Sequence, residues 1–191
     1  MRVLGINGSP RKDSNTALMI RHIFEELEKE GIETELVQFA GQPIRGCMAC
    51  LKCRENQDKR CVIETDCFND VFAKMCEADG IIIGSPTYVA SVTAEVKALI
   101  DRATYVTLAN GGLLRRKVGA GISAVRRAGS ITAIDTINHF LVIAQMVIPG
   151  SSYWPLAIGR NIGEVEGDEE GIRCMHVLGE NMAWLLKKLH A

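Results

Sequence analysis

Short apolar runs alternate along the chain with segments whose apolar residues recur at helical spacing. Val3 to Ile6 is the first apolar run, and a segment with helical periodicity from Ala17 to Leu27 follows it and stops at Gly31. The segment from Ile32 alternates as a half-buried strand does, whereas Gly80 to Gly84 is apolar on both faces. The second pattern is typical of a central strand in a parallel sheet.

The alternation of strands and helices continues to the end of the chain. Further elements are expected as helices at 68–78, 92–100, 131–146 and 172–189 and as strands from Val118 and across 152–158. This pattern predicts an α/β fold, a doubly wound parallel sheet of five strands in a single domain spanning residues 1–191. The segment 40–65 is an irregular, Cys-rich insertion, and loops of this length are usually functional or disordered.

Charge and hydropathy exclude several classes of partner. The 22 Lys and Arg residues nearly balance the 23 Asp and Glu residues, with no basic stripe, so we expect no nucleic-acid partner. No apolar run approaches the ~18 residues of a membrane span, and the first residues lack the apolar core of a signal peptide. We therefore expect a soluble, cytoplasmic protein without a membrane partner.

The turn after the first strand, GSPRKDSNT at 8–16, has the composition of an anion-binding loop. Backbone N–H groups at such a turn and at the following helix N-terminus converge on one point, which suits a phosphate. The candidate binding residues are Ser9, Arg11, Ser14, Asn15 and Thr16. The simpler alternative is a turn in which Ser14 or Asn15 only caps the helix. The Walker pattern and a GxGxxG fingerprint are both missing here.

Two later turns should reach the same edge, because ligands of open α/β sheets lie beyond the carboxyl ends of the strands. They are SPTYVASVT at 85–93 and SAVRRAGS at 123–130. The candidate residues beside a flat ring are Pro86, Thr87, Tyr88, Val89, Ser123, Arg126, Arg127 and Gly129. Ordinary strand-to-helix connections are the alternative. GAGISA at 119–124 also fits GxGxxA, although its small residues suit a central strand better.

Four of the seven cysteines lie close together, as Cys47-x2-Cys50-x2-Cys53-x7-Cys61. Thiolates three residues apart can reach different corners of one iron–sulfur cube, and a later cysteine can close the fourth. A four-thiolate zinc site and unligated thiols are the alternatives. Cys76 and Cys174 are interpreted as incidental thiols, and the four histidines as packing residues.

These segments together resemble the iron–sulfur flavoprotein branch of the NADPH-dependent FMN reductase-like proteins. The resemblance rests on GSPRKDSNT, on CMACLKC with a later cysteine and on ADGIIIGSPTYVASVTAEVKALIDR, and it covers residues 1 to about 130. It implies a flavodoxin-like fold, FMN held at the three turns, and a [4Fe-4S] cluster on Cys47, Cys50, Cys53 and Cys61. Family members often carry an acidic pair where this chain has Asp66-Cys67, so Cys67 stays open as an alternative fourth ligand.

The resemblance implies an electron-transfer oxidoreductase in which FMN takes reducing equivalents and the cluster relays single electrons, with no catalytic side chain. The implied partners are a redox protein such as ferredoxin, or NAD(P)H, and further copies of the chain in a homodimer or homotetramer. One alternative is an NAD(P)H-dependent FMN or quinone reductase without a cluster. Another is a flavin-free module for metal binding or redox sensing.

Overall fold

The computed structural model describes all residues, Met1 to Ala191, and contains one parallel sheet of five strands. The strands are β1 (Arg2–Asn7), β2 (Glu33–Gln38), β3 (Gly80–Pro86), β4 (Val118–Val125) and β5 (Leu156–Ile158). Their spatial order is β2-β1-β3-β4-β5, the flavodoxin-like order of doubly wound sheets. The predicted fold class is confirmed.

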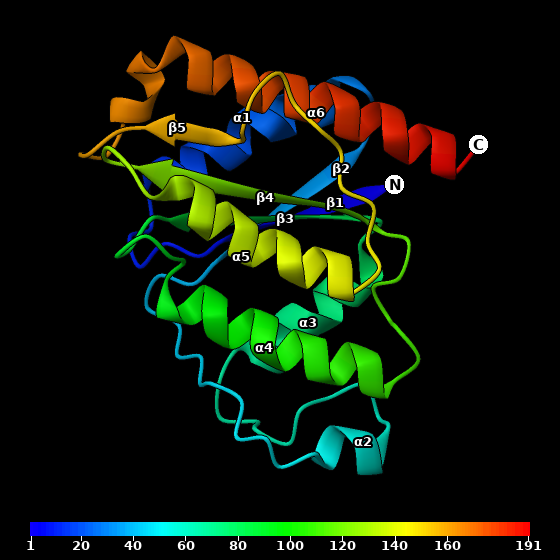
Figure 1. The fold of residues 1–191 in the computed structure, drawn as a ribbon. Coiled ribbons are helices and arrows are strands. Elements are labelled where there is room, and N and C mark those ends of the chain that lie inside the picture. The colour runs from blue at the N-terminus through cyan, green and yellow to red at the C-terminus, as the bar shows by residue number, and fades with distance from the viewer.

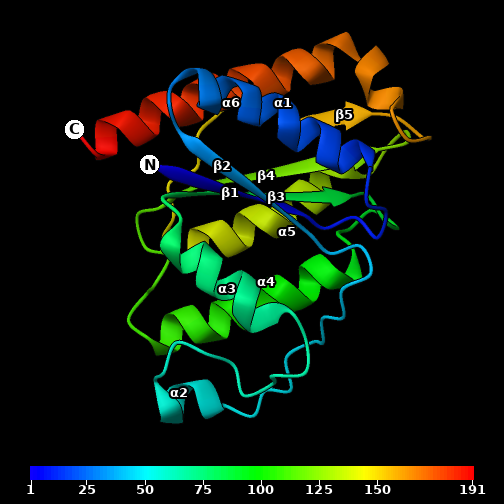
Figure 2. The ribbon, with the colours of Figure 1, turned by 180° about the vertical axis from the view of Figure 1, so that it is seen from behind.

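Helices cover both faces of the sheet (Figures 1 and 2). The helices are α1 (Asn15–Lys29), α2 (Lys52–Asn56), α3 (Phe68–Glu77), α4 (Ala94–Ala109), α5 (Ser130–Ile143) and α6 (Glu169–Leu189), with a 3₁₀ turn η1 (Glu164–Gly167). α1 and α6 pack on one face, and α3, α4 and α5 pack on the other. Each face has its own apolar core.

The central strands are apolar on both sides because each side faces one of these cores. Ile81 and Ile83 of β3 belong to the core under α3, α4 and α5, whereas Ile82 belongs to the core under α1 and α6. In β4, Gly119 and Gly121 admit helix α5, since a Cβ at either position would lie 2.8 Å from Leu141 or Ile137. GAGISA therefore lies inside a strand, and the dinucleotide-turn interpretation of it is wrong.

The structure differs from the sequence-based elements in α4, which continues to Ala109 and not only to 100, and in the last third. β5 is a three-residue strand, much shorter than the expected 152–158, and α5 ends at Ile143. α6 begins three residues before the expected 172, because the Asp168 carboxylate accepts a hydrogen bond from the Gly171 N–H at 3.1 Å. The short elements α2 and η1 have no apolar periodicity and were not predicted.

None of the helices combines the length and the apolar character that crossing a lipid bilayer requires.

Candidate functional site

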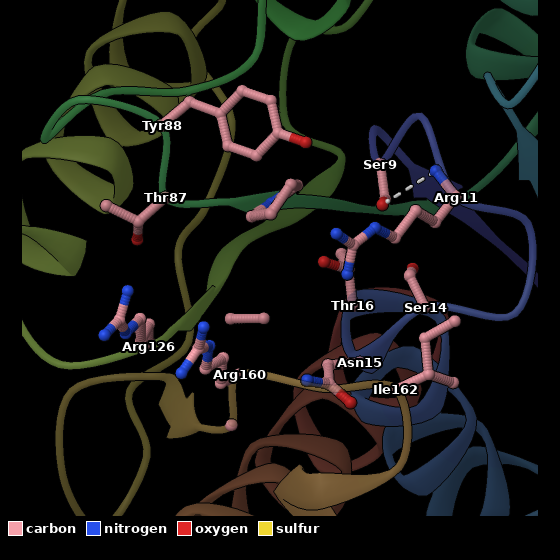
Figure 3. Close-up of a pocket in the computed structure, with 13 residues that line it drawn as sticks. Ser9, Arg11, Ser14, Asn15, Thr16, Thr87, Tyr88, Arg126, Arg160 and Ile162 are labelled. Carbon is pink, nitrogen blue, oxygen red and sulfur yellow. Dashed lines mark hydrogen bonds between the residues drawn. The ribbon is translucent and has the colours of Figure 1, made fainter.

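A pocket of about 240 Å³ opens at the carboxyl edge of the sheet, where β1, β3 and β4 end (Figure 3). It is lined by Ser9, Arg11, Ser14, Asn15, Thr16, Pro86, Thr87, Tyr88, Ala124, Arg126, Gly159, Arg160 and Ile162. Three arginines and no carboxylate line it, so the pocket favours an anion. Its position is the one at which doubly wound sheets bind ligands.

Hydrogen bonds within the first turn hold it in shape. Asn7 Oδ1 accepts from the Ser9 N–H at 3.1 Å and from the Ser14 hydroxyl at 3.2 Å. Ser9 Oγ accepts from the Arg11 N–H at 3.1 Å, the contact drawn as a dashed line in Figure 3. Ser14 also caps α1, accepting from the Ala17 N–H at 3.2 Å. Ser14 thus has the capping role that the sequence left open, and it still lines the pocket.

Thr16 supplies the clearest sign that the pocket is built for a ligand. Its hydroxyl oxygen is buried in the pocket wall and has no hydrogen-bond partner in the protein. A buried hydroxyl without a partner costs about 1 to 3 kcal/mol, so such groups are rare. Thr16 lies in the first turn of α1, where free N–H groups and the helix dipole favour an anion. The pocket therefore fits a phosphate group.

Asn15 lines the pocket, but its side chain is committed elsewhere. The Asn15 amide donates to the Asn161 carbonyl and accepts from the Gly163 N–H, both at 2.8 Å. These bonds fix the segment after β5 against the start of α1. That segment contributes three lining residues, Gly159, Arg160 and Ile162, that sequence reasoning missed because no anion-binding motif marks the turn after the expected strand at 152–158.

The turn after β3 forms the opposite wall. Tyr88 and Ser91 exchange two backbone hydrogen bonds of 2.9 Å, which closes a tight turn over Val89 and Ala90. Both central residues have left-handed φ angles, 50° and 55°, which cost free energy for residues with a Cβ. Val89 is fully exposed at the tip of this turn and does not line the pocket. Strain of this kind is often found at binding sites.

Three other expected residues also lie outside the lining. Ser123 is buried in β4, where its hydroxyl lies 2.9 Å from the Thr87 hydroxyl and donates to the Ser85 carbonyl at 3.0 Å. Ser123 thus holds the start of the turn after β3 in place through Ser85 and Thr87. Gly129 has φ 91° and passes so close to Ala90 that a Cβ there would meet it at 3.0 Å. Arg127 is exposed, while its neighbour Arg126 does line the pocket.

The four clustered cysteines converge on a second cavity, separate from the first. It is lined by Cys47, Met48, Ala49, Cys50, Leu51, Cys53, Cys61, Val62, Ile63, Arg102, Tyr105 and Val106. No histidine or carboxylate lines it, so the available ligands are thiols alone. The Ala49 N–H points to Cys47 Sγ at 3.4 Å, and Ala49 and Leu51 both adopt left-handed φ angles that turn the chain around the thiols.

Cys67 lies elsewhere, beside the core at the start of α3, and does not line this cavity. Burial raises the pKa of the Cys67 thiol, with a smaller contribution from the nearby Asp66 carboxylate. Burial likewise raises the pKa of Cys53 inside the cavity. A thiol of this kind stays protonated until a metal displaces its proton.

A buried arginine anchors the cysteine segment to α4. The Arg102 guanidinium donates to the Asp66 carboxylate at 2.6 Å and to the carbonyls of Arg45 and Ile63, each at 3.1 Å. Its side chain is 0% exposed and stacks over the Phe68 ring at 4.1 Å. Arg102 therefore joins both ends of the segment to the core, a role the sequence did not reveal because Arg102 lies far away in the chain.

The two cavities lie at opposite ends of α4. Thr93, which caps α4, donates its hydroxyl to the Gly8 carbonyl beside the first pocket, whereas Val106 lines the cysteine cavity. At 1.5 Å per residue these positions are about 20 Å apart. Figure 1 shows segment 40–65 running below α4, with α2 under the far end of that helix. Lys97 and Asp101 form an ion pair of 2.6 Å on the helix surface between them.

Comparison with known proteins agrees with these features. The family model described as NADPH-dependent FMN reductase matches residues 1–160. An iron–sulfur flavoprotein of Methanocaldococcus jannaschii is 36% identical over 98% of each chain. Another, from Methanosarcina thermophila, is 36% identical over 80% of this chain and 78% of its own.

Solved structures show the same fold. RosB, crystallised with bound 8-demethyl-8-formylriboflavin-5'-phosphate, superposes with a TM-score of 0.81 at 20% identity, covering 100% of this chain and 80% of its own. A flavodoxin from the domain Archaea superposes with a TM-score of 0.63 at 16% identity, covering 98% and 99%. On the sequence matches, this chain belongs to the NADPH-dependent FMN reductase family and, within it, to the iron–sulfur flavoproteins.

Proposed function

We propose that this protein is a flavin-dependent electron-transfer oxidoreductase that binds FMN at the carboxyl-edge pocket and a [4Fe-4S] cluster at the cysteine cavity. FMN can exchange electrons in pairs or singly, and an iron–sulfur cluster passes them one at a time. The observation that carries the proposal is the convergence of four thiols on one cavity in a chain that also has a phosphate-type pocket.

The first pocket is suited to the phosphate end of FMN. The unpartnered Thr16 hydroxyl can donate to a phosphate oxygen, and the nearby Arg11 guanidinium supplies positive charge. Tyr88 and Pro86 offer an aromatic and an apolar surface to a flat ring. The cavity of about 240 Å³ is smaller than the 300 to 1,000 Å³ that usually enclose a ligand, so the ring would extend beyond it.

The second cavity is suited to a cluster with cysteine ligands. Cys47, Cys50, Cys53 and Cys61 line it together, whereas Cys67 does not, which favours Cys61 as the fourth ligand. Backbone N–H groups near the sulfurs, as at Ala49, are the contacts that tune such clusters. The apolar lining would limit the access of water.

We further propose that the protein acts as a homodimer or homotetramer and takes electrons from NAD(P)H or from a protein such as ferredoxin. Within one chain the cavities are separated by most of the length of α4, and the rate of electron tunnelling falls steeply with distance. A cysteine segment from a second copy, lying over the exposed ring, would shorten this path.

The proposal is tested by anaerobic reconstitution with FMN, iron and sulfide, followed by metal analysis and EPR of the reduced protein. We expect about one FMN and four irons per chain. Serine at Cys47, Cys50, Cys53 or Cys61 should lower iron and sulfide and leave FMN unchanged, because the phosphate loop is remote from the thiols. Serine at Cys76 or Cys174 is the matched control and should change neither, and serine at Cys67 tests the alternative fourth ligand.

The alternatives give different results. FMN without iron and sulfide would identify a simple flavin reductase, and zinc without FMN would identify a metal-binding module. If the Cys67 variant loses the cluster and the Cys61 variant keeps it, the fourth ligand is Cys67 and not Cys61.

A further inference from the structure

Two histidines far apart in the sequence meet on the outer side of the α1–α6 pair. His22 comes from α1 and His176 from α6, and their ring centroids lie 5.2 Å apart in an edge-to-face arrangement. Glu25 lies one turn along α1 from His22, with its carboxylate 3.5 Å from His22 Nδ1. One ligand atom from each of these three residues lies within 4.8 Å of the other two.

Two further carboxylates, one for each histidine, orient the imidazoles. His22 Nε2 lies 3.1 and 3.0 Å from the two carboxylate oxygens of Glu166 in η1. His176 Nδ1 lies 2.6 Å from Glu26 Oε1. Since a carboxylate accepts a proton, these partners place the N–H on His22 Nε2 and on His176 Nδ1. In the neutral imidazole, the other nitrogen of each ring then carries a lone pair.

The remaining nitrogen of His22 has no hydrogen-bond partner. Its Nδ1 atom is buried without a hydrogen bond, even though the His22 side chain as a whole is 17% exposed. Histidine held by a carboxylate through one nitrogen and free at the other is the usual arrangement of a metal-ligating imidazole. The same pattern occurs here twice, on two helices, beside a third carboxylate.

We propose that His22, Glu25 and His176 form a binding site for a divalent transition-metal ion, with zinc as the best match. Zinc takes imidazole and carboxylate ligands at about 2.0 to 2.2 Å, so tetrahedral ligand atoms lie about 3.3 Å apart. The His22–Glu25 separation of 3.5 Å is already close to this value, and small side-chain rotations would bring in His176. Water would complete the coordination.

The site would tie three elements together. His22 and Glu25 belong to α1, His176 belongs to α6, and Glu166 connects the site to η1. The ion would therefore add to the stability of the α1–α6 layer by binding the folded state only. This site is distinct from the cysteine cavity, which contains thiols and no histidine.

Zinc binding is measured on the holoprotein, whose thiols are occupied by the cluster, by competition with a chelating indicator. A parallel sample with alkylated thiols keeps the test independent of the proposed function. We expect one zinc per chain in both samples, and a higher melting temperature with zinc than without it. The zinc X-ray absorption edge should show nitrogen and oxygen scatterers and no sulfur.

Three variants remove one ligand atom each and keep the rest of the network. His22→Gln keeps an amide donor for Glu166, His176→Asn keeps one for Glu26, and Glu25→Gln removes the charged ligand. Each should weaken zinc binding at least tenfold and abolish the rise in melting temperature. His139→Gln, at an exposed histidine on α5, is the control and should bind zinc like the wild type.

Circular dichroism and FMN retention verify that each variant is folded. Wild-type protein that binds no zinc at micromolar concentration in either sample would overturn the proposal. Variants that bind as tightly as the wild type, or sulfur in the zinc coordination shell, would do the same.

Discussion

Removing the Thr16 hydroxyl should affect FMN affinity and protein stability differently. Because it is buried without a partner, Thr16→Val removes an unsatisfied group and should leave the free energy of unfolding of the apoprotein unchanged or about 1 kcal/mol higher. A hydrogen bond to a charged group is worth about 1.5 to 3 kcal/mol, so FMN affinity should fall by roughly ten- to a hundredfold. Fluorescence titration of FMN measures this.

Thr104→Val is the matched control on α4, outside the pocket, where the hydroxyl donates to the Ile100 carbonyl at 2.7 Å. FMN affinity should not change in this variant. Equal affinities of the Thr16 variant and the wild type would exclude Thr16 as a phosphate ligand.

Asp66 makes a pH-dependent contribution to stability. Burial by itself would raise its pKa, but hydrogen bonds from Arg102 and from the N–H groups of Arg45 and Phe68, with the Arg102 charge, lower it overall. A folded-state pKa below the unfolded value of about 3.9 gives stability that is present above about pH 4. That stability is lost as the pH falls through the folded-state pKa.

Asp66→Asn should therefore lower the free energy of unfolding by about 3 kcal/mol at pH 7, because it leaves the buried Arg102 without its partner. The difference in free energy of unfolding between the variant and the wild type should become smaller below about pH 4. Denaturant unfolding across this pH range measures it. Asp101→Asn, in the exposed pair with Lys97, is the control and should cost less than about 1 kcal/mol. A gap that does not change with pH would contradict the assignment.

At the scale of elements, the turn from Tyr88 to Ser91 carries backbone strain. Its two central residues have the φ angles of a hairpin turn that prefers Asn-Gly, yet they are Val89 and Ala90. Replacing them with Val89→Asn and Ala90→Gly should raise the free energy of unfolding by about 1 kcal/mol. Val89→Thr, which keeps a β-branched side chain, should bring no such gain. Chemical denaturation of the apoproteins decides, and equal stabilities would show that the turn is unstrained.

Element prediction was most successful where burial is strongest. The sequence pattern predicted β3, β4 and α1 well, because each of these elements faces a core. The strand expected across 152–158 shrinks to the three paired residues of β5, and α2 has no buried residue and leaves no pattern. The residues that line the pocket after β5 were missed because no motif marks the turn that follows the expected strand.

At the scale of the whole molecule, the distance between the two cavities predicts assembly. If a cysteine segment reaches the flavin of a second copy, light scattering should show a dimer or tetramer at micromolar concentration. In a hybrid oligomer, a Cys61→Ser chain keeps only its flavin, and a chain with Arg11→Ala and Thr16→Val keeps only its cluster. The flavin of the first chain should still reduce the cluster of the second. A monomer that transfers electrons at the wild-type rate would refute the arrangement between subunits.

Three features can be read from the sequence alone: the alternation of strands and helices, the donor-rich composition of the turn at 8–16, and the thiol spacing from Cys47 to Cys61. These are local properties, because they depend on periodicity and on residues close together in the chain. The fold places Cys61, and not Cys67, in the cavity with the other thiols, and it holds Asn15 against the segment after β5. It also brought Arg102 to Asp66 and His22 to His176. Sheet order and helix packing set these long-range contacts, and neither is visible in any local stretch of sequence.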